Sequence, residues 1–234
     1  MFERDRQQTL AELRHKMSGG LAPVISTGRQ VLTVPAPLAE ILPRGGLPRG
    51  GVVSLGGRSG VTSLLLTLLA APANTWSALV GMPAVGLLAA AELGVDLDRL
   101  ALIPDPGPDV LQVLSVLTDG VDMIALVPPK VLAPARLRVL TARLRQSGAV
   151  LLVAGQWPGA DLVLNSRIEN WTGLGPGHGR LRDRELVVEV GGRGAAGRRS
   201  TAVMFLQSTR SGVEIGAVPD RVRRSADPLI AEVG

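Results

Sequence analysis

The sequence predicts a single α/β domain, with a mostly parallel sheet flanked by helices and extended by antiparallel strands toward the C-terminus. Three observations predict it. Short, continuously apolar segments alternate with helical segments between residues 52 and 154, as in parallel sheets covered on both faces. After residue 156 the helical segments give way to consecutive strand-like segments joined by glycine-rich turns. The chain has 234 residues, 46% of them hydrophobic, which is enough for one core of this kind.

Each predicted strand is a short apolar run, and each predicted helix carries apolar residues at helical spacing. The first group of strands is expected at residues 30–34, 52–55, 77–80, 101–103, 123–127 and 150–154. The helices are expected at residues 38–42, 62–71, 84–93, 108–118 and 134–146. The C-terminal strands are expected at residues 162–171, 186–190, 202–207 and 213–215.

Both ends of the chain are predicted to lie outside the core domain. An amphipathic helix is expected within residues 1–20, the core within 21–216 and a tail at 217–234. The helix could pack on its own domain or dock onto another molecule, and the sequence leaves both open. The candidate partner-binding residues come from the two ends: Leu10, Leu13, Met17, Arg221, Arg223, Arg224, Leu229 and Ile230.

Composition excludes several kinds of chemistry. The chain has no cysteine and two histidines, which excludes disulfides and thiolate catalysis and leaves no basis for expecting a metal centre. The charged N-terminus is unlike a signal peptide, and no apolar stretch is long enough to span a bilayer. We therefore expect a cytoplasmic protein with no membrane partner, associated with the nucleoid when it is in a complex.

The positive charge is concentrated in one region. Residues 178–224 contain ten arginines and five acidic residues, which equals the net charge of +5 for the whole chain. Such a region can attract DNA or an acidic protein surface, although a solvated arginine-rich surface is the simpler alternative. The candidate DNA contacts are Arg180, Arg182, Arg184, Arg193, Arg198 and Arg199.

A glycine-rich loop lies between the strand expected at 52–55 and the helix expected at 62–71, where many α/β folds bind phosphate. The common phosphate-loop motif G-x-x-x-x-G-K-[ST] uses its lysine to offset phosphate charge and its hydroxyl to hold Mg²⁺. Here Gly60 and Thr62 fit the end of the motif, but Val61 stands at the lysine position and Leu55 at the first glycine. The loop is therefore predicted to be vestigial, and it comprises Gly56, Gly57, Arg58, Ser59, Gly60, Val61, Thr62 and Ser63.

Several segments around this loop carry a family resemblance. In order along the chain they are Ser26-Thr-Gly, Gly45-Gly-Leu-Pro-Arg-Gly, Gly94-Val-Asp-Leu-Asp-Arg-Leu, Val121-Asp-Met-Ile-Ala-Leu-Val and Val150-Leu-Leu-Val-Ala-Gly-Gln. Their order and spacing over residues 26 to about 207 are similar to those of RecA recombinases. The resemblance implies a RecA-like core.

The same resemblance implies where the catalytic residues should stand. The Walker B aspartate position falls on Val127, the catalytic glutamate near Met82 and the adenine-stacking tyrosine on Ala89, while the nucleotide-sensing glutamine is kept as Gln156. The segments that follow Val127 and Gln156 are too short to form long DNA-binding loops. Because phosphoryl transfer depends on charge stabilisation and positioning, the resemblance implies that catalysis and the binding of ATP and Mg²⁺ are lost.

A narrower resemblance rests on the N-terminal helix, on residues 45–51 and on residues 160–174. These are similar to the ImuA type of RecA-like protein, particularly its actinobacterial form. This implies a non-catalytic accessory protein of SOS-induced translesion synthesis and mutagenesis. The implied partner is an inactive Y-family polymerase homologue of the ImuB type, and through it an error-prone replicative-type polymerase and the sliding clamp.

Three other functions remain open from the sequence. One is a SulA-like cell-division inhibitor, which would bind the FtsZ division protein. Another is a weak ATPase that uses Arg58 in place of the missing lysine. The third is a basic DNA-binding module, whose affinity for DNA would fall steeply with salt.

Overall fold

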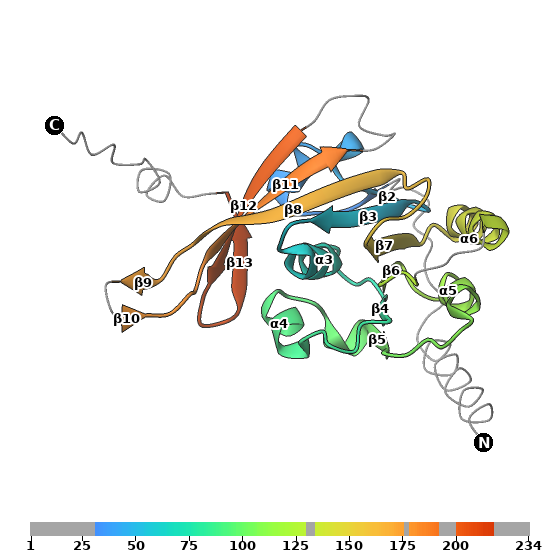
Figure 1. Ribbon diagram of the computed structural model, residues 1–234, viewed down its shortest axis with the longest axis horizontal. Helices are drawn as coiled ribbons and strands as arrows, with labels where there is room; N and C mark the ends of the chain where they lie inside the picture. The colour runs from blue at the N-terminus through green and yellow to red at the C-terminus, as the bar shows by residue number, and fades with distance from the viewer. Residues whose placement is uncertain (1–30, 130–133, 176–177, 192–199, 218–234) are drawn as a thin grey trace, which may run out of the picture.

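The computed structural model describes residues 31–129, 134–175, 178–191 and 200–217. They form an α/β domain built on a nine-stranded mixed sheet, with strand order β13-β12-β11-β8-β3-β7-β6-β4-β5 (Figure 1). Six neighbouring strands, from β8 to β5, pair in parallel, and the three at the other edge pair antiparallel. The predicted class, a mostly parallel sheet extended by C-terminal antiparallel strands, is confirmed.

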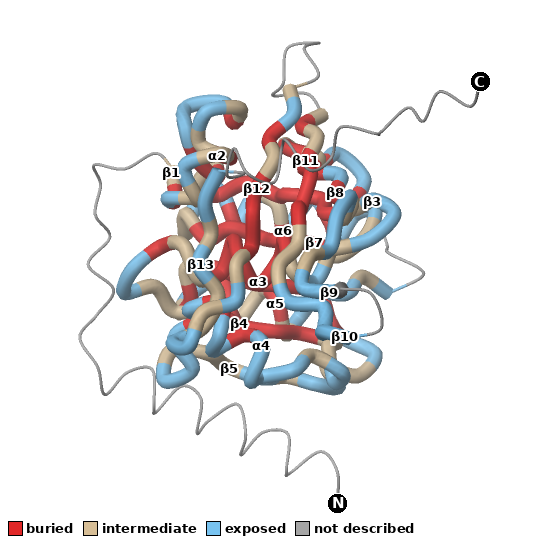
Figure 2. The backbone as a smooth tube through the Cα atoms, turned by 90° about the vertical axis from the view of Figure 1, so that its left-hand side faces the viewer, coloured by how far each residue is buried: buried red, intermediate tan, exposed pale blue. Residues whose placement is uncertain are grey.

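The four central parallel strands β3, β4, β6 and β7 are short and mostly buried on both faces, which explains their largely apolar sequences, whereas the edge strand β5 and the ten-residue β8 are only partly buried. Their bounds are β3 Val52–Gly57, β4 Ser77–Val80, β5 Leu100–Ile103, β6 Met123–Leu126, β7 Val150–Ala154 and β8 Leu162–Trp171. Alternate residues of one strand enter different cores: in β7, Leu152 joins the core on one face, while Leu151 and Val153 join the core on the other. Figure 2 shows the buried residues gathered along these central strands.

Helices cover the sheet in two layers (Figure 1). On one face, α2 (Ala36–Ala39), α3 (Val61–Ala70) and α4 (Leu87–Glu92) contribute to the first core. On the other face, α5 (Val110–Leu117) and α6 (Pro134–Ser147) contribute to the second core. Single turns of 3-10 helix, η1 (Pro43–Gly45) and η2 (Leu97–Arg99), lie in the connections.

The C-terminal strands β11 (Arg184–Gly191), β12 (Ser200–Ser208) and β13 (Val213–Gly216) extend the sheet beyond β8. The antiparallel pair of β8 and β11 places Trp171 opposite Arg184 and continues beyond them. There the Arg182 amide donates to the Thr172 carbonyl at 3.0 Å, and the Arg180 amide donates to the Gly173 carbonyl at 3.1 Å. We call this projecting part, residues 171–175 and 178–184, the arm.

Two small sheets were not predicted. The strands β9 (Leu174–Gly175) and β10 (His178–Gly179) pair within the arm. The strands β1 (Val31–Leu32) and β2 (Leu47–Pro48) pair at the start of the described chain; β1 lies within the strand expected at residues 30–34, whereas β2 was not predicted. All the other strands and helices predicted between residues 30 and 216 are present, and the bounds of β4, β7 and β8 match the prediction.

Three helices are shorter than predicted: α2 has four residues where five were expected, α4 six where ten were expected, and α5 eight where eleven were expected. The helix expected at 84–93 spans only Leu87–Glu92, because residues 83–86 form a turn and an extended segment that ends at the N-cap Gly86. The predicted N-terminal helix within residues 1–20 and the tail from residue 218 lie outside the described residues. None of the described helices is long and apolar enough to cross a membrane.

Candidate functional site

The predicted site residues meet at the carboxyl edge of the parallel strands, where open α/β sheets bind their ligands. The strand registers pair Leu55 of β3 with Ala154 of β7, and Val80 of β4 with Leu126 of β6. The loop after β3 and the positions Met82, Val127 and Gln156 therefore follow strands that end at this one edge.

The glycine-rich loop is shorter than the sequence predicts. Gly56 and Gly57 belong to β3 and pair with Asn165 and Ser166 of β8, so the connection to α3 consists only of residues 58–60. The prediction of a five-residue loop at 56–60 was wrong, because β8 supplies a partner for the strand to extend along. The helix α3 begins at Val61, one residue earlier than predicted.

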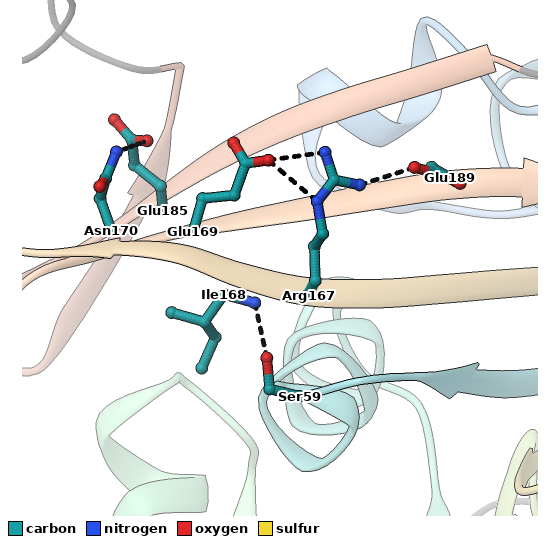
Figure 3. A network of polar contacts seen from close by, with 7 residues as sticks. All are labelled: Ser59, Arg167, Ile168, Glu169, Asn170, Glu185 and Glu189. Carbon is teal, nitrogen blue, oxygen red and sulfur yellow. Dashed lines mark hydrogen bonds and ion pairs between the residues drawn. The ribbon is translucent and has the colours of Figure 1, made fainter. Parts of the chain in front are cut away.

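Polar groups of this connection bond to β8. The Arg58 amide donates to the Ser166 carbonyl at 3.1 Å. The Ser166 hydroxyl lies 2.9 Å from the Ser59 carbonyl and 3.3 Å from the Gly56 carbonyl. The Ile168 amide donates to the Ser59 hydroxyl at 2.8 Å (Figure 3). The connection is therefore fixed to the neighbouring strand at three points.

Two glycines of this region permit close approach to the C-terminal strands. At Gly57, where φ is +121°, a Cβ would lie 1.9 Å from the Ser166 carbonyl oxygen. At Gly60, where φ is +79°, a Cβ would lie 2.5 Å from a methyl carbon of Leu186. Both positions combine a left-handed backbone with a close neighbour, so glycine is required for packing irrespective of any ligand.

Side chains at the predicted catalytic positions are apolar or uncharged. Val61 packs against the first core, as does Met82. Val127 is 43% exposed, and its amide donates to the Val80 carbonyl at 3.2 Å. Ala89 and Gln156 are exposed. Within the described residues, no three His, Cys, Asp or Glu side chains come together as metal ligands.

A shallow hollow of about 460 Å³ lies beside the N-terminus of α3. Its lining combines residues 59–63 with three side chains from the C-terminal strands: Ile168, Trp171 and Arg184. The helix has Gly60 as its N-cap, with no side-chain hydrogen bond to satisfy its first amides. The hollow is therefore bordered by the positive end of the helix and by an arginine.

Arg184 is held between the helix and the arm. Its guanidinium group donates to the Ser63 hydroxyl at 3.2 Å and lies 5.4 Å from the centre of the Trp171 ring. Partial burial lowers the pKa of Arg184 below its ordinary value. This residue was predicted as a DNA contact, but in the structure it joins α3 to the base of the arm.

The carboxylates around the arm are occupied by local contacts. Arg167 bonds to Glu169 and Glu189, each at 2.6 Å, and Asn170 bonds to Glu185 at 2.8 Å (Figure 3). The hydrogen bond to Glu169 is the main reason that the pKa of Arg167 rises above its ordinary value. Asp183 bonds to the Thr172 hydroxyl and to the Ser208 amide.

Exposed apolar and basic side chains occur together on the arm. Trp171 is 45% exposed, Leu174 65% and Leu181 51%. Arg180 and Arg182 are exposed, and neither forms an ion pair with another residue of the described ranges. Sequence reasoning missed the two leucines; their position on either side of a glycine-rich segment, outside any regular apolar pattern, was the available signal.

The remaining predicted site residues are not placed. Arg193, Arg198 and Arg199 lie outside the described residues, as do the partner-binding candidates at both ends of the chain, namely Leu10, Leu13, Met17, Arg221, Arg223, Arg224, Leu229 and Ile230.

Comparison with known proteins gives two matches. The model of the family described as the MT3502 N-terminal domain matches residues 40–159, which run from just after α2 to the connection between β7 and β8. The uncharacterized protein Rv3395c of Mycobacterium tuberculosis is 38% identical over 201 residues, which cover 80% of this chain and 89% of the mycobacterial protein. The chain therefore belongs to the family defined by the MT3502 N-terminal domain.

Proposed function

We propose that this protein is a non-catalytic, RecA-like accessory protein of DNA-damage-induced translesion synthesis that binds an inactive Y-family polymerase homologue. The observation that carries the proposal is that polar groups of the glycine-rich connection between β3 and α3 already form hydrogen bonds within the sheet. Its Arg58 amide and Ser59 hydroxyl are bonded to β8. In a phosphate-binding loop such groups would face the ligand.

The RecA-like part of the proposal is supported by the positions of the resembling segments. The segment at 121–127 forms β6 and its end, and the segment at 150–156 forms β7 and its end. Both strands run parallel to β3 and end at the same edge of the sheet. In the RecA resemblance, that is where the Walker B and sensor residues stand.

The non-catalytic part follows from electrostatics. Phosphoryl transfer requires cations and a metal ligand that stabilise charge on the transferring phosphate. Val61 packs against the core, and Val127 presents an aliphatic side chain at the end of β6. Arg58 is the cation within the connection, but its main chain is tied to β8, and the guanidinium group of Arg184 beside α3 is bonded to Ser63. These features favour a binding function for this protein.

The arm is the described surface best suited to a protein partner. Exposed tryptophan and leucine side chains on a projecting hairpin are typical of binding surfaces, and tryptophan is common among residues that dominate binding energy. Arg180 and Arg182 beside them favour a partner with acidic residues near an apolar patch. The predicted assembly with a replicative-type polymerase and the sliding clamp would then form through this partner.

Affinity measurements with the purified ImuB-type polymerase homologue test both the proposed binding of this partner and the assignment of the arm as the binding surface. We expect the wild-type chain to bind, and Trp171→Ala together with Leu174→Ser to weaken binding by about tenfold or more. Leu88→Ser is the matched control, since Leu88 is 75% exposed on α4 and is not part of the arm. Absence of wild-type binding would contradict the function. Equal affinity of the arm variant and the wild type would contradict only the assignment of the arm as the binding surface.

A second candidate function, DNA binding, is favoured by the same two arginines. Phosphate contacts make affinity for DNA fall steeply with salt. We expect Arg180→Ala with Arg182→Ala to reduce both the affinity of the isolated chain for DNA and its salt dependence, if the arm binds DNA directly. Fluorescence anisotropy with a labelled single strand at two salt concentrations would decide between this function and a purely protein-binding one.

A further inference from the structure

A second and larger hollow lies at the opposite, amino-terminal edge of the parallel strands. Its volume is about 690 Å³, and it lies between the last turn of α6 and the segment that joins α5 to β6. The apolar part of its lining comes from Trp76, Val121, Val139, Ala142 and Ala149. Val139 and Ala142 are exposed on α6, Val139 to 66%.

The charges of this hollow are paired within the domain. Arg49 bonds to Asp122 at 3.2 Å, and the other carboxylate oxygen of Asp122 accepts from the Trp76 amide at 3.1 Å. Arg143 bonds to Asp119 through two nitrogens. Both carboxylates are thus already engaged, so the hollow offers a ligand mainly its apolar surface.

The stripe of α6 residues along the hollow has a helical spacing, with two apolar side chains and one glutamine. Val139, Ala142 and Gln146 fall at i, i+3 and i+7 on one face of the helix, and all three line the hollow. A small residue at the centre of such a stripe allows a second helix to approach closely. The shape therefore suits a short amphipathic helix packed along α6.

The chain itself brings such a segment to this place. Val31, the first described residue, pairs with Pro48, and the next residue, Arg49, lines the hollow. Residues 1–30 therefore join the domain beside the hollow. Within them Leu10, Leu13 and Met17 have the same i, i+3, i+7 spacing as the stripe on α6.

The connection between the two parts is long enough. Residues 18–30 separate Met17 from Val31, and an extended chain of this length spans roughly 45 Å. Gly19, Gly20 and Pro23 within it favour a change of direction after a helix. A tethered segment also has a high effective concentration, on the order of millimolar for short flexible linkers.

We propose that residues 3–17 dock as an amphipathic helix in the hollow between α5 and α6 of the same chain. Leu10, Leu13 and Met17 would then cover Val139, Ala142 and Trp76. This proposal assigns those three residues to the chain's own core instead of to a partner protein. It stands independently of the proposed function.

Disulfide trapping tests the docking directly, because the natural chain has no cysteine. In full-length protein, Leu13→Cys with Val139→Cys should form a bond within one chain under mild oxidation by diamide. Leu13→Cys with Leu88→Cys is the control pair, since Leu88 lies on α4, on the other face of the sheet. Non-reducing electrophoresis and intact mass distinguish a bond within one chain from one between chains.

Faster bonding within the chain for the Val139 pair than for the control supports the proposal. Equal rates in the two pairs, no bond in either, or bonds only between two chains would overturn it. Hydrogen exchange gives a second measurement without cysteine. Residues 3–17 should exchange about tenfold or more slowly in the intact protein than in a peptide of residues 1–20, and Val139→Asp should restore the peptide rate. Exchange at the peptide rate in the wild-type protein would also overturn the proposal.

Discussion

The Ile168 amide donates a hydrogen bond of 2.8 Å to the Ser59 hydroxyl, across 109 residues of sequence (Figure 3). The side chain of Ile168 also lies close to Gly60, the N-cap of α3. The entry to the helix is therefore fixed to β8 by main-chain and side-chain contacts together. A connection held in this way contributes to the stability of the sheet, which can be measured apart from any partner.

Ser166→Ala should lower the free energy of unfolding by about 1–2 kcal/mol. Ser166 is 2% exposed, and its hydroxyl lies within hydrogen-bond distance of the Ser59 and Gly56 carbonyls. Removing the hydroxyl leaves these acceptors without their buried donor. Urea unfolding measures the change, and Ser211→Ala in an exposed turn is the control. Equal stability of the two variants would show that the Ser166 contacts contribute little.

Gly57→Ala should cost about 3 kcal/mol or more, or prevent folding altogether. The methyl group would combine a φ of +121° with a clash at 1.9 Å against the Ser166 carbonyl. Gly191→Ala is the matched control, because Gly191 also ends a strand but a Cβ there would have no neighbour within 4 Å among the described residues. Circular dichroism and urea unfolding would compare the two. A Gly57→Ala protein as stable as the control would mean that β3 and β8 are not joined in this register.

The strands could be predicted because their signal is local. β4 and β7 are largely apolar runs between turn residues, β8 begins with one, and the predicted bounds of all three match the structure. The role of Gly56 and Gly57 could not be predicted in this way. A glycine-rich segment after a strand looks the same whether it turns early or extends along a neighbour, and that neighbour, β8, comes about 110 residues later.

The candidate site, like the strands, could be predicted only in part: the edge of the sheet at which it lies could be predicted, but its long-range contacts could not. Parallel strands end at one edge, so the meeting of Met82, Val127 and Gln156 at that edge follows from the strand assignments alone. The contact of Arg184 with Ser63, separated by 121 residues, depends on how the arm bends over α3. No pattern within either segment contains that information, and the same holds for the exposure of Trp171.

Val61→Lys should fail to create a nucleotide site. The substitution restores the cation of the phosphate-loop motif, but the Arg58 amide and the Ser59 hydroxyl remain bonded to β8. Val127 also still stands where the resemblance places a magnesium-binding aspartate. Titration with a fluorescent ATP analogue and Mg²⁺ should show no micromolar binding for wild type or variant, each with an unchanged circular dichroism spectrum.

Micromolar binding by the variant alone would mean that the missing lysine was the main obstacle, and that the connection can leave β8. Micromolar binding by the wild type would contradict the non-catalytic proposal more directly, and would favour the reading in which Arg58 replaces the lysine. Arg58→Ala would then be expected to abolish it.

Arg184→Met should leave the free energy of unfolding within about 1 kcal/mol of wild type, or raise it. Burial lowers the pKa of Arg184, which means that folding disfavours its charged form. The side chain is charged at neutral pH in both the folded and the unfolded state, so this penalty is present throughout the neutral range and would be relieved only at alkaline pH. Methionine keeps a long apolar stem beside Trp171 without the desolvated charge.

The contrasting variant is Arg167→Met, at a partly exposed arginine bonded to two glutamates. Here stability should fall, and the loss should shrink at high salt because exposed ion pairs are screened. Urea unfolding at low and high salt compares the two arginines. A large loss at Arg184 that also shrinks with salt would show that a carboxylate outside the described residues pairs with it, and Arg184 would then have to be treated as one half of an ion pair.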